Sequence, residues 1–192
     1  MYRTVVLDAA ERIFGRDGFH GTKMQDVARE AGISLNTLYG TYPSKREVFE
    51  ALHEARGSEF MEQIEAALAA PGDARESLGR GVVAFVDYLI GHPDFFRIDL
   101  REGRSWAIGD AEASPAFRAG IETWTELVRR GVSEGVFHDE DPAVMAVTTF
   151  GLMQIQLAAW LAKRKPPELD QIARHITTAI ERTLCIPDKP AR

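Results

Sequence analysis

The sequence predicts an all-α protein of about nine helices, in which a small three-helix domain precedes a larger helical domain. Apolar residues recur at helical spacing along almost the whole chain. Serine, threonine or aspartate stands before most of these apolar runs, as is typical of helix N-termini. Glycine and proline separate the runs, and no segment reads as a strand meander.

The bulk composition predicts a cytoplasmic protein with a buried core. The chain has 192 residues, of which 45% are hydrophobic. Its single cysteine, Cys185, excludes an intramolecular disulfide framework and fits a reducing compartment. The N-terminus lacks an apolar signal-peptide segment, and we expect no run of the roughly 20 apolar residues that a membrane span needs.

The first three helices are expected before Pro43. The first ends near Gly18. Thr22, with Gln25 three residues later, has the pattern of a capping box that opens the second helix. Gly32 is expected to end that helix in the left-handed conformation, and Ser34 is expected to cap the third.

Six further helices are expected after Pro43. A capping box opens a long helix at Ser44, and another restarts the chain at Asp73 after Pro71-Gly72. Asp141-Pro142 predicts a strongly apolar helix. The expected ranges are about 44–70, 73–91, 95–100, 114–131, 141–162 and 169–184. We place the domain boundary after residue 50, which gives domains of residues 1–50 and 51–192.

The charge distribution bears on nucleic-acid binding. The net charge is −6, which taken alone argues against a polyanionic partner. Residues 1–56, however, are neutral, and no acid occurs between Ala31 and Arg46. A surface that approaches phosphates needs such a stretch, although a chance acid-free run fits the charge counts equally well.

The segment from Thr22 to Lys45 predicts a helix-turn-helix. Two short helices are joined by a tight turn at residues 31–34, and a third helix precedes them. In this arrangement the second helix of the pair, the reading helix, lies in the major groove of DNA. Its exposed face should therefore carry small, polar or aromatic groups and no carboxylates. The chain supplies Ser34, Asn36, Thr37, Tyr39 and Thr41.

This segment resembles the DNA-binding signature of TetR-family regulators. The resemblance covers about residues 5–52. The matching stretches are Gly21-Thr22, Val27-Ala28-Arg29-Glu30-Ala31-Gly32-Ile33-Ser34, Thr37-Leu38-Tyr39 and Tyr42-Pro43-Ser44-Lys45. The resemblance implies a transcriptional regulator with an N-terminal DNA-binding domain and a larger domain for ligand binding and dimerisation.

The resemblance also implies roles for individual residues. Thr22, Tyr39 and Lys45 would contact phosphates, which set the register on DNA. The candidates for contact with base edges or the adjacent backbone are Ser34, Leu35, Asn36, Thr37, Gly40, Thr41 and Tyr42. Leu35, Gly40 and Thr41 depart from the residues frequent in the family, so the target sequence stays open. Leu35 could touch a thymine methyl group or simply pack against the domain.

In the family, two C-terminal helices of each subunit form the dimer interface. Here the matching segments are Val144–Ala162 and Leu169–Leu184. The predicted interface residues are Gly151, Ile155, Ala159, Ile172, Ile176 and Ile180. The alternative is that these apolar stripes belong to the core of a single chain. A two-fold homodimer would match two half-sites on double-stranded DNA.

The family's ligand pocket lies among the middle helices. We expect an apolar pocket for an unidentified, apolar or aromatic small molecule. The predicted lining residues are Trp106, Trp124, Phe150 and Trp160, with Gln154 or Gln156 as polar contacts. The alternative for each aromatic residue is ordinary core packing.

Other function classes have little support in the sequence. The five histidines are scattered, none has the spacing of a helical zinc pair, and no Gly-rich phosphate loop or nucleophile elbow occurs. We therefore expect no enzyme activity, no cofactor and no metal. The leading hypothesis is a dimeric repressor that binds a pseudo-palindromic operator and is released by a small molecule. The alternatives are a ligand-independent repressor and a small-molecule-binding or scaffolding protein whose helix-turn-helix has lost its affinity for DNA.

Overall fold

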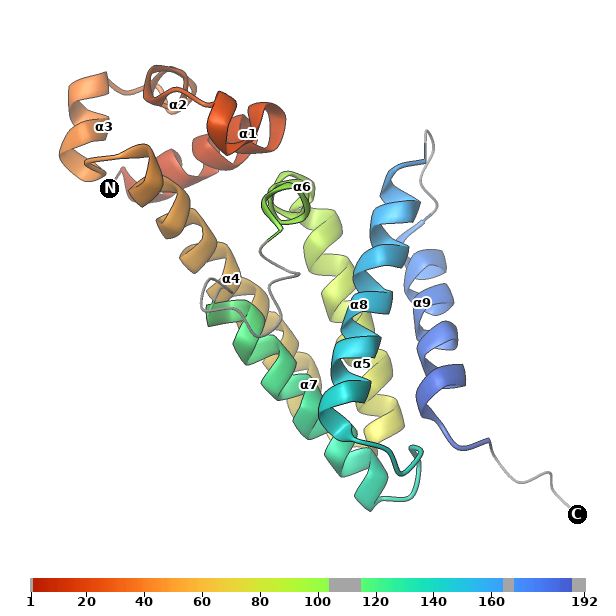
Figure 1. Ribbon diagram of the computed structural model, residues 1–192. Helices are drawn as coiled ribbons and strands as arrows, with labels where there is room; N and C mark the ends of the chain where they lie inside the picture. The colour runs from red at the N-terminus through yellow and green to blue at the C-terminus, as the bar shows by residue number, and fades with distance from the viewer. Residues whose placement is uncertain (1, 104–114, 164–167, 188–192) are drawn as a thin grey trace, which may run out of the picture. The chain divides into compact units, whose positions relative to one another are not determined.

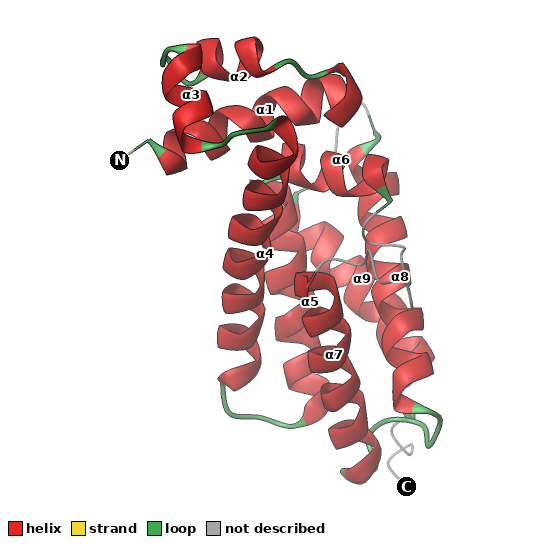
Figure 2. Ribbon diagram, turned by 60° about the vertical axis from the view of Figure 1, so that its left-hand side comes forward, coloured by secondary structure: helices red, strands yellow, loops and turns green. Residues whose placement is uncertain are grey.

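The computed structural model describes residues 2–103, 115–163 and 168–187. Within these ranges it contains nine helices and no strand (Figures 1 and 2). The helices are α1 (Arg3–Gly21), α2 (Met24–Glu30), α3 (Leu35–Thr41), α4 (Lys45–Ala69), α5 (Ala74–Gly91), α6 (Pro93–Glu102), α7 (Pro115–Ser133), α8 (Pro142–Leu161) and α9 (Leu169–Leu184). The predicted all-α class and the order of its helices are confirmed.

Side-chain caps determine where several helices begin. The hydroxyl of Ser34 accepts a hydrogen bond from the backbone N–H of Thr37 at 3.0 Å. Asp73 and Glu76 form the predicted reciprocal box, in which each side chain accepts from the other residue's N–H. Asp141 accepts from the N–H of Ala143 at 2.8 Å. Each cap satisfies N–H groups that the first turn of a helix leaves unpaired.

The chain divides into two compact units. Unit 1 comprises residues Met1–Glu59 and Gly91–Phe117, and unit 2 comprises Phe60–Ile90 and Arg118–Arg192. Helix α4 contributes its first part to unit 1 and its second part to unit 2.

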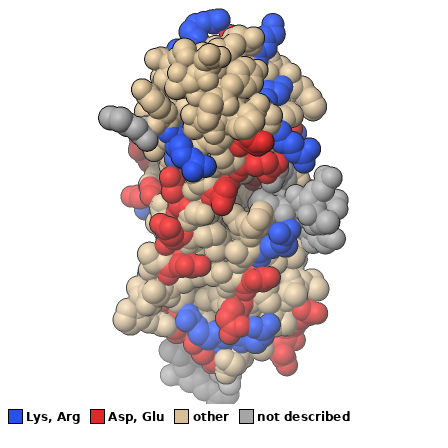
Figure 3. Space-filling model, turned by 90° about the vertical axis from the view of Figure 1, so that its left-hand side faces the viewer, with Lys and Arg blue, Asp and Glu red and all other residues tan. Residues whose placement is uncertain are grey.

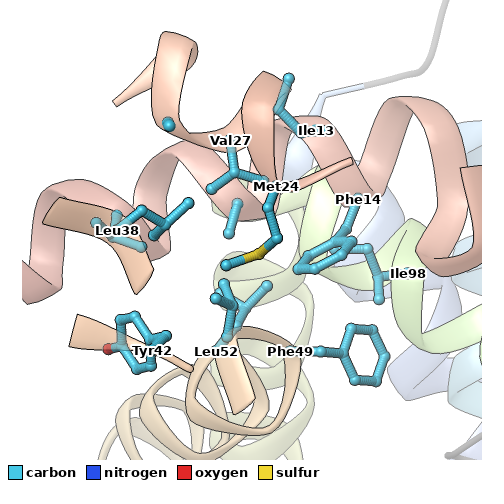
Figure 4. Packing of buried hydrophobic residues seen from close by; sticks show 13 residues of the cluster. Ile13, Phe14, Met24, Val27, Leu38, Tyr42, Phe49, Leu52 and Ile98 are labelled. Atoms are coloured by element: carbon cyan, nitrogen blue, oxygen red, sulfur yellow. The ribbon is translucent and has the colours of Figure 1, made fainter. Parts of the chain in front are cut away.

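The core of unit 1 is formed by α1, α2, α3 and α4, together with one residue of α6 (Figure 4). Leu38 of α3 is fully buried there beside Met24, Val27 and Tyr42. Burying a side chain of this size stabilises the fold by roughly 1.5–3 kcal/mol. The core therefore fixes which face of α3 points outward.

Helix α6 lies directly on α1 within unit 1. A Cβ added at Gly15 would lie 2.7 Å from the Cβ of Asp94, so only glycine allows this approach. The guanidinium of Arg101 donates to the carbonyl of Gly15 at 2.9 Å. The first helix of unit 1 is thus held by the helix that follows α5.

A partly buried arginine joins α1 to α4. Arg56 donates to Glu11 at 2.7 Å, to Asp8 at 2.5 Å and to Glu59 at 2.9 Å. The side chains of Arg56 and Glu11 are only 11% and 10% exposed. Burial lowers the pKa of Arg56, but the hydrogen bond and charge of Glu11, helped by Asp8 and Glu59, outweigh it and raise this pKa above its ordinary value. Nδ1 of His92, at the start of α6, lies 3.6 Å from Glu11.

Unit 2 packs aromatic rings against glycines. A Cβ at Gly81 would lie 2.8 Å from the ring of Trp124, and one at Gly131 would overlap the ring of Phe137. Helices α8 and α9 lie side by side. The end of α9 is tied to the loop before α8, because the N–H of His138 donates to the carbonyl of Leu184 at 2.9 Å.

Helix α8 is long and apolar enough to span a membrane by length and composition, with a mean hydropathy of 1.5. The expectation that no segment is long and apolar enough to span a membrane is therefore wrong for α8. Core helices of water-soluble proteins meet the same criterion. The residues of α8 in the core of unit 2 are Met145, Ala146, Thr149, Phe150, Met153, Gln154 and Leu157.

We predict that Arg56→Leu lowers the free energy of unfolding by about 3–5 kcal/mol. Removing one partner of a buried ion pair leaves the carboxylate of Glu11 without its counter-charge. Urea unfolding, followed by circular dichroism, measures this decrease.

The matched control is Arg12→Leu, which removes the exposed pair between Arg12 and Glu30. An exposed pair contributes about 0–1 kcal/mol. Equal decreases in the two variants would show that the Arg56 pairs do not hold α1 on α4.

Candidate DNA-binding interface

The turn between α2 and α3 has the geometry that the sequence predicts. Gly32 has a φ of 67°, in the left-handed region where glycine is favoured. The N–H of Ile33 donates to the carbonyl of Ala28 at 3.0 Å and closes the end of α2. Ser34 then caps α3, so the two helices of the motif are joined by a four-residue connection, Ala31–Ser34.

The junction between α1 and α2 differs from the prediction. α1 continues past Gly18, whose φ of 73° kinks it, and α2 begins only at Met24 with Lys23 at its N-cap. The hydroxyl of Thr22 donates to the carbonyl of Gly18 at 2.8 Å. The prediction that Thr22 caps α2 is therefore wrong, because its hydroxyl closes the end of α1 instead. Thr22 is also only 3% exposed.

Helix α3 turns a small set of residues outward. Ser34, Asn36, Tyr39 and Gly40 are exposed, and the side chain of Tyr39 is 43% accessible. Apart from its two chain neighbours and the backbone of its own helix, no atom lies within 4 Å of where a Cβ of Gly40 would be. Asn36, Tyr39 and Gly40, at the helical spacing i, i+3 and i+4, therefore share one outward face of α3, and Ser34 is exposed at its N-cap.

The other predicted residues of α3 and its end face inward or bond locally. Leu35 is half-buried against the core of unit 1, which supports the packing alternative for this residue. The hydroxyl of Thr37 lies 2.8 Å from that of Ser34, and the hydroxyl of Thr41 donates to the carbonyl of Thr37 at 3.0 Å. Tyr42 is 4% exposed. These residues shape and hold the reading helix.

Lys45 has three carbonyl partners inside the protein. Its Nζ lies 2.6 Å from the carbonyl oxygen of Phe19, 2.9 Å from that of Thr22 and 3.4 Å from that of His20. It also lies 4.6 Å from the centre of the Phe19 ring. The ammonium group that the resemblance assigns to a phosphate thus binds the end of α1 in this structure.

Two exposed cations near these residues were not among the predicted contacts. Lys23 follows Thr22, and Arg46 follows Lys45. Their only signal in the sequence was this adjacency to two predicted contacts. On the face of unit 1 drawn in Figure 3, a mostly uncharged area is bordered by Lys and Arg and, along its lower side, by Asp and Glu. A phosphate backbone meets little repulsion over the uncharged area.

Two family models match the chain. The model of the bacterial regulatory proteins of the tetR family matches residues 6–52, and the tetracyclin repressor-like C-terminal domain matches residues 71–184. The chain belongs to the TetR family. It is therefore a transcriptional regulator with a DNA-binding helix-turn-helix at its N-terminus.

Proteins named as transcriptional regulators resemble the chain over most of its length. An uncharacterized HTH-type transcriptional regulator of Bacillus subtilis, YezE, is 25% identical and covers 92% of this chain and 93% of its own. The transcriptional activator FasR of Mycolicibacterium smegmatis is 24% identical, over 88% of this chain and 76% of its own. A regulator from Saccharomonospora viridis, solved with choline, has the same fold at 23% identity, with a TM-score of 0.77 over 96% of this chain and 98% of its own.

In this TetR-family chain, the predicted ligand residues are only partly brought together. Trp124 and Phe150 are buried in unit 2, at 3% and 7% exposure, and Gln154 is buried on α8. Trp160 is half-buried, with its ring 5.4 Å from that of His175 on α9. Trp106 lies outside the described residues. Nε1 of Trp124, Oε1 of Gln154 and Oε1 of Gln156 are buried and have no hydrogen-bond partner among the described residues.

The predicted dimer residues divide into two groups. On α8, Ile155 is 57% exposed, Ala159 is exposed and Gly151 has open space around it. On α9, Ile172, Ile176 and Ile180 are all 0% exposed within the single chain. The isoleucine stripe therefore belongs to the intramolecular core, and its assignment to the dimer interface is corrected. The outward side of α9 instead lines a hollow of about 480 Å³ formed by Gln171, Arg174, His175, Thr178, Ala179 and Arg182.

Proposed function

We propose that this TetR-family regulator is a repressor that binds a pseudo-palindromic DNA operator as a homodimer and releases it when a small molecule binds unit 2. The observation that carries the proposal is the outward face of α3. Asn36, Tyr39 and Gly40 stand on one face of an acid-free helix whose opposite side is buried in the core of unit 1, and Ser34 is exposed at the N-cap of that helix. A helix presented in this way suits the major groove, which admits one helix.

The exposed side chains of α3 suggest which residues contact bases and which contact phosphates. Asn36 can form a bidentate pair with adenine, which discriminates by about 1–3 kcal/mol. Tyr39 stands farther along the outward face, where its hydroxyl suits a phosphate oxygen. The hydroxyls of Thr37 and Thr41 form hydrogen bonds within α3 and its N-cap, so these two residues stabilise the helix. They would contact DNA only at the margin of the interface.

We predict that selection from random duplex DNA recovers a pseudo-palindrome with half-sites one helical turn apart, about 34–36 Å. Asn36→Ala should relax preference at defined positions of each half-site, because it removes a base contact. Tyr39→Ala should weaken binding to all sequences to a similar degree. Sequencing of the bound pools and titration of the selected duplex measure both effects.

The control for this experiment is Glu65→Ala, an exposed change on the part of α4 that belongs to unit 2. It should leave the selected sequence unchanged. If the unaltered protein enriches no sequence even at low salt, the repressor proposal fails. The scaffolding and small-molecule-binding alternative would then take its place.

The exposed apolar residues of α8 support dimerisation through this helix. Ile155 and Val144 are 57% and 59% exposed, with the small residues Gly151 and Ala159 on the same helix. Small residues allow close approach of a second helix, and a two-fold interface presents the same patch from both subunits.

We predict that Ile155→Glu converts the dimer to a monomer at micromolar concentration, because it places a charge in the interface. Sedimentation velocity measures the change. The matched control is Val83→Glu on α5, where the side chain is 48% exposed. A dimer that survives Ile155→Glu, or that dissociates equally in both variants, would contradict the assignment.

The buried polar atoms of unit 2 support a ligand site. An unpaired buried donor or acceptor costs about 1–3 kcal/mol, so Nε1 of Trp124 and Oε1 of Gln154 are groups that a bound molecule could satisfy. The Saccharomonospora viridis relative was solved with choline. A ligand could favour a state of the dimer in which the distance between the two reading helices no longer matches the two half-sites. The protein would then release DNA by a population shift.

We predict that a small-molecule panel that includes choline contains a compound that quenches tryptophan fluorescence and releases DNA. Because Trp124 is the buried candidate, Trp124→Phe should remove most of the quenching, whereas Trp160→Phe should keep it. Saturable binding that leaves the emission of the unaltered protein unchanged would count against this site.

A further inference from the structure

We infer that Lys45, at the start of α4, is a positioning residue whose ammonium group binds the C-terminal end of α1. The cations that contact the DNA phosphates are instead its exposed neighbours, Lys23 before α2 and Arg46 on α4. This inference rests on the proposed DNA binding and reassigns the phosphate contact that the resemblance gives to Lys45. It follows from the partners of the Lys and Arg side chains in the described part of unit 1.

The ammonium of Lys45 is fully occupied. An ammonium group has three N–H donors, and three main-chain carbonyl oxygens lie within 3.4 Å of Nζ. Two of them, those of Phe19 and His20, belong to the last turn of α1, where helix carbonyls lack partners within the helix. The third is the carbonyl of Thr22, in the connection to α2.

The site favours a cation for two further reasons. The C-terminal end of α1 carries a partial negative charge from the helix dipole. The face of the Phe19 ring, 4.6 Å from Nζ, adds a cation–π attraction. Moving this ammonium to a phosphate would leave the carbonyls of Phe19 and Thr22 without these hydrogen bonds.

Nearly all other cations of unit 1 also have partners. Of the Lys and Arg side chains in the described part of unit 1, only Lys23 and Arg46 have none within the protein. The paired ones, with their partners, are Arg3 with Tyr42, Arg12 with Glu30, Arg16 with Asp17, Arg29 with Asp26, Lys45 with three carbonyls, Arg56 with Asp8, Glu11 and Glu59, Arg97 with Asp94, and Arg101 with the carbonyl of Gly15.

The two unpaired cations flank the contact that Lys45 makes. Lys23 follows Thr22, whose carbonyl accepts from Lys45 at 2.9 Å, and Arg46 follows Lys45 itself. Both side chains are exposed. Lys45 therefore draws together two chain segments, one before α2 and one at the start of α4, that each present one exposed positive charge. Free cations can release counterions from DNA without first breaking an internal ion pair.

The test is the salt dependence of DNA binding by the full-length protein. The probe is a mixed-sequence duplex, titrated without small molecules at several salt concentrations and well below the unfolding temperature. The variants are Lys23→Met, Arg46→Met and Lys45→Met. The matched control is Arg12→Met, which removes the same charge from a residue already paired with Glu30.

We expect Lys23→Met and Arg46→Met each to make the plot of log affinity against log salt shallower by about 0.9 for each phosphate that is no longer neutralised, or about 1.8 in a dimer. Lys45→Met should keep the slope of the Arg12→Met control, with lower affinity at every salt concentration. Its thermal midpoint should fall by several degrees, about 2–8 °C. Lys45→Arg should not restore that midpoint, because a planar guanidinium does not match three converging carbonyls.

A slope lowered by about 1.8 in Lys45→Met, with an unchanged thermal midpoint, would overturn the inference. Slopes of Lys23→Met and Arg46→Met equal to that of the control would also overturn it. If Lys45→Met does not fold, the salt slopes of Lys23→Met and Arg46→Met and the thermal midpoint of Lys45→Arg still test the inference. If the unaltered protein fails to bind duplex DNA at low salt, the proposed function itself fails and this assignment fails with it.

Discussion

A partly buried guanidinium must be surrounded by carboxylates or carbonyls, and this requirement organises unit 1. Arg56 meets it with three carboxylates, two from α1 and one from its own helix. Because those carboxylates come from the middle of α1, the pairs fix where α1 crosses α4. The ammonium of Lys45 is likewise surrounded by carbonyl oxygens, at the end of α1. Leu38 is buried in the core that α1 and α4 share with α2 and α3, and its burial sets which face of α3 points outward.

The sequence predicted the helices well wherever the signal was local. Ser34, Asp73 and Asp141 cap helices as expected, because a short polar side chain reaches the N–H groups of its own first turn. The same logic failed at Thr22. There the hydroxyl donates to the carbonyl of Gly18, which also accepts from the N–H of Thr22, and these bonds close α1 in place of the expected cap of α2. A choice between two nearby partners depends on backbone geometry, which the residue pattern does not contain.

Sites were harder to predict than helices, for a related reason. The spacing of Ile172, Ile176 and Ile180 shows that one face of α9 is buried, but not whether its own chain or a second subunit covers it. Likewise, the motif places a lysine at position 45 but does not say which oxygens its ammonium binds. Both questions are settled by contacts between residues far apart in sequence. The exposed residues of α3 were predictable because a buried Leu38 dictates which neighbours point outward.

Position 40 of the reading helix can change in sequence with little effect on the packing of unit 1. Outside its own helix backbone and chain neighbours, nothing lies within 4 Å of where its Cβ would be, so a side chain can begin there without a clash at Cβ. Most replacements would also suit a helix better than glycine does. In most proteins, a new specificity has to be reconciled with packing. At this position a duplicated copy of the regulator could acquire a different operator through one substitution and keep its stability.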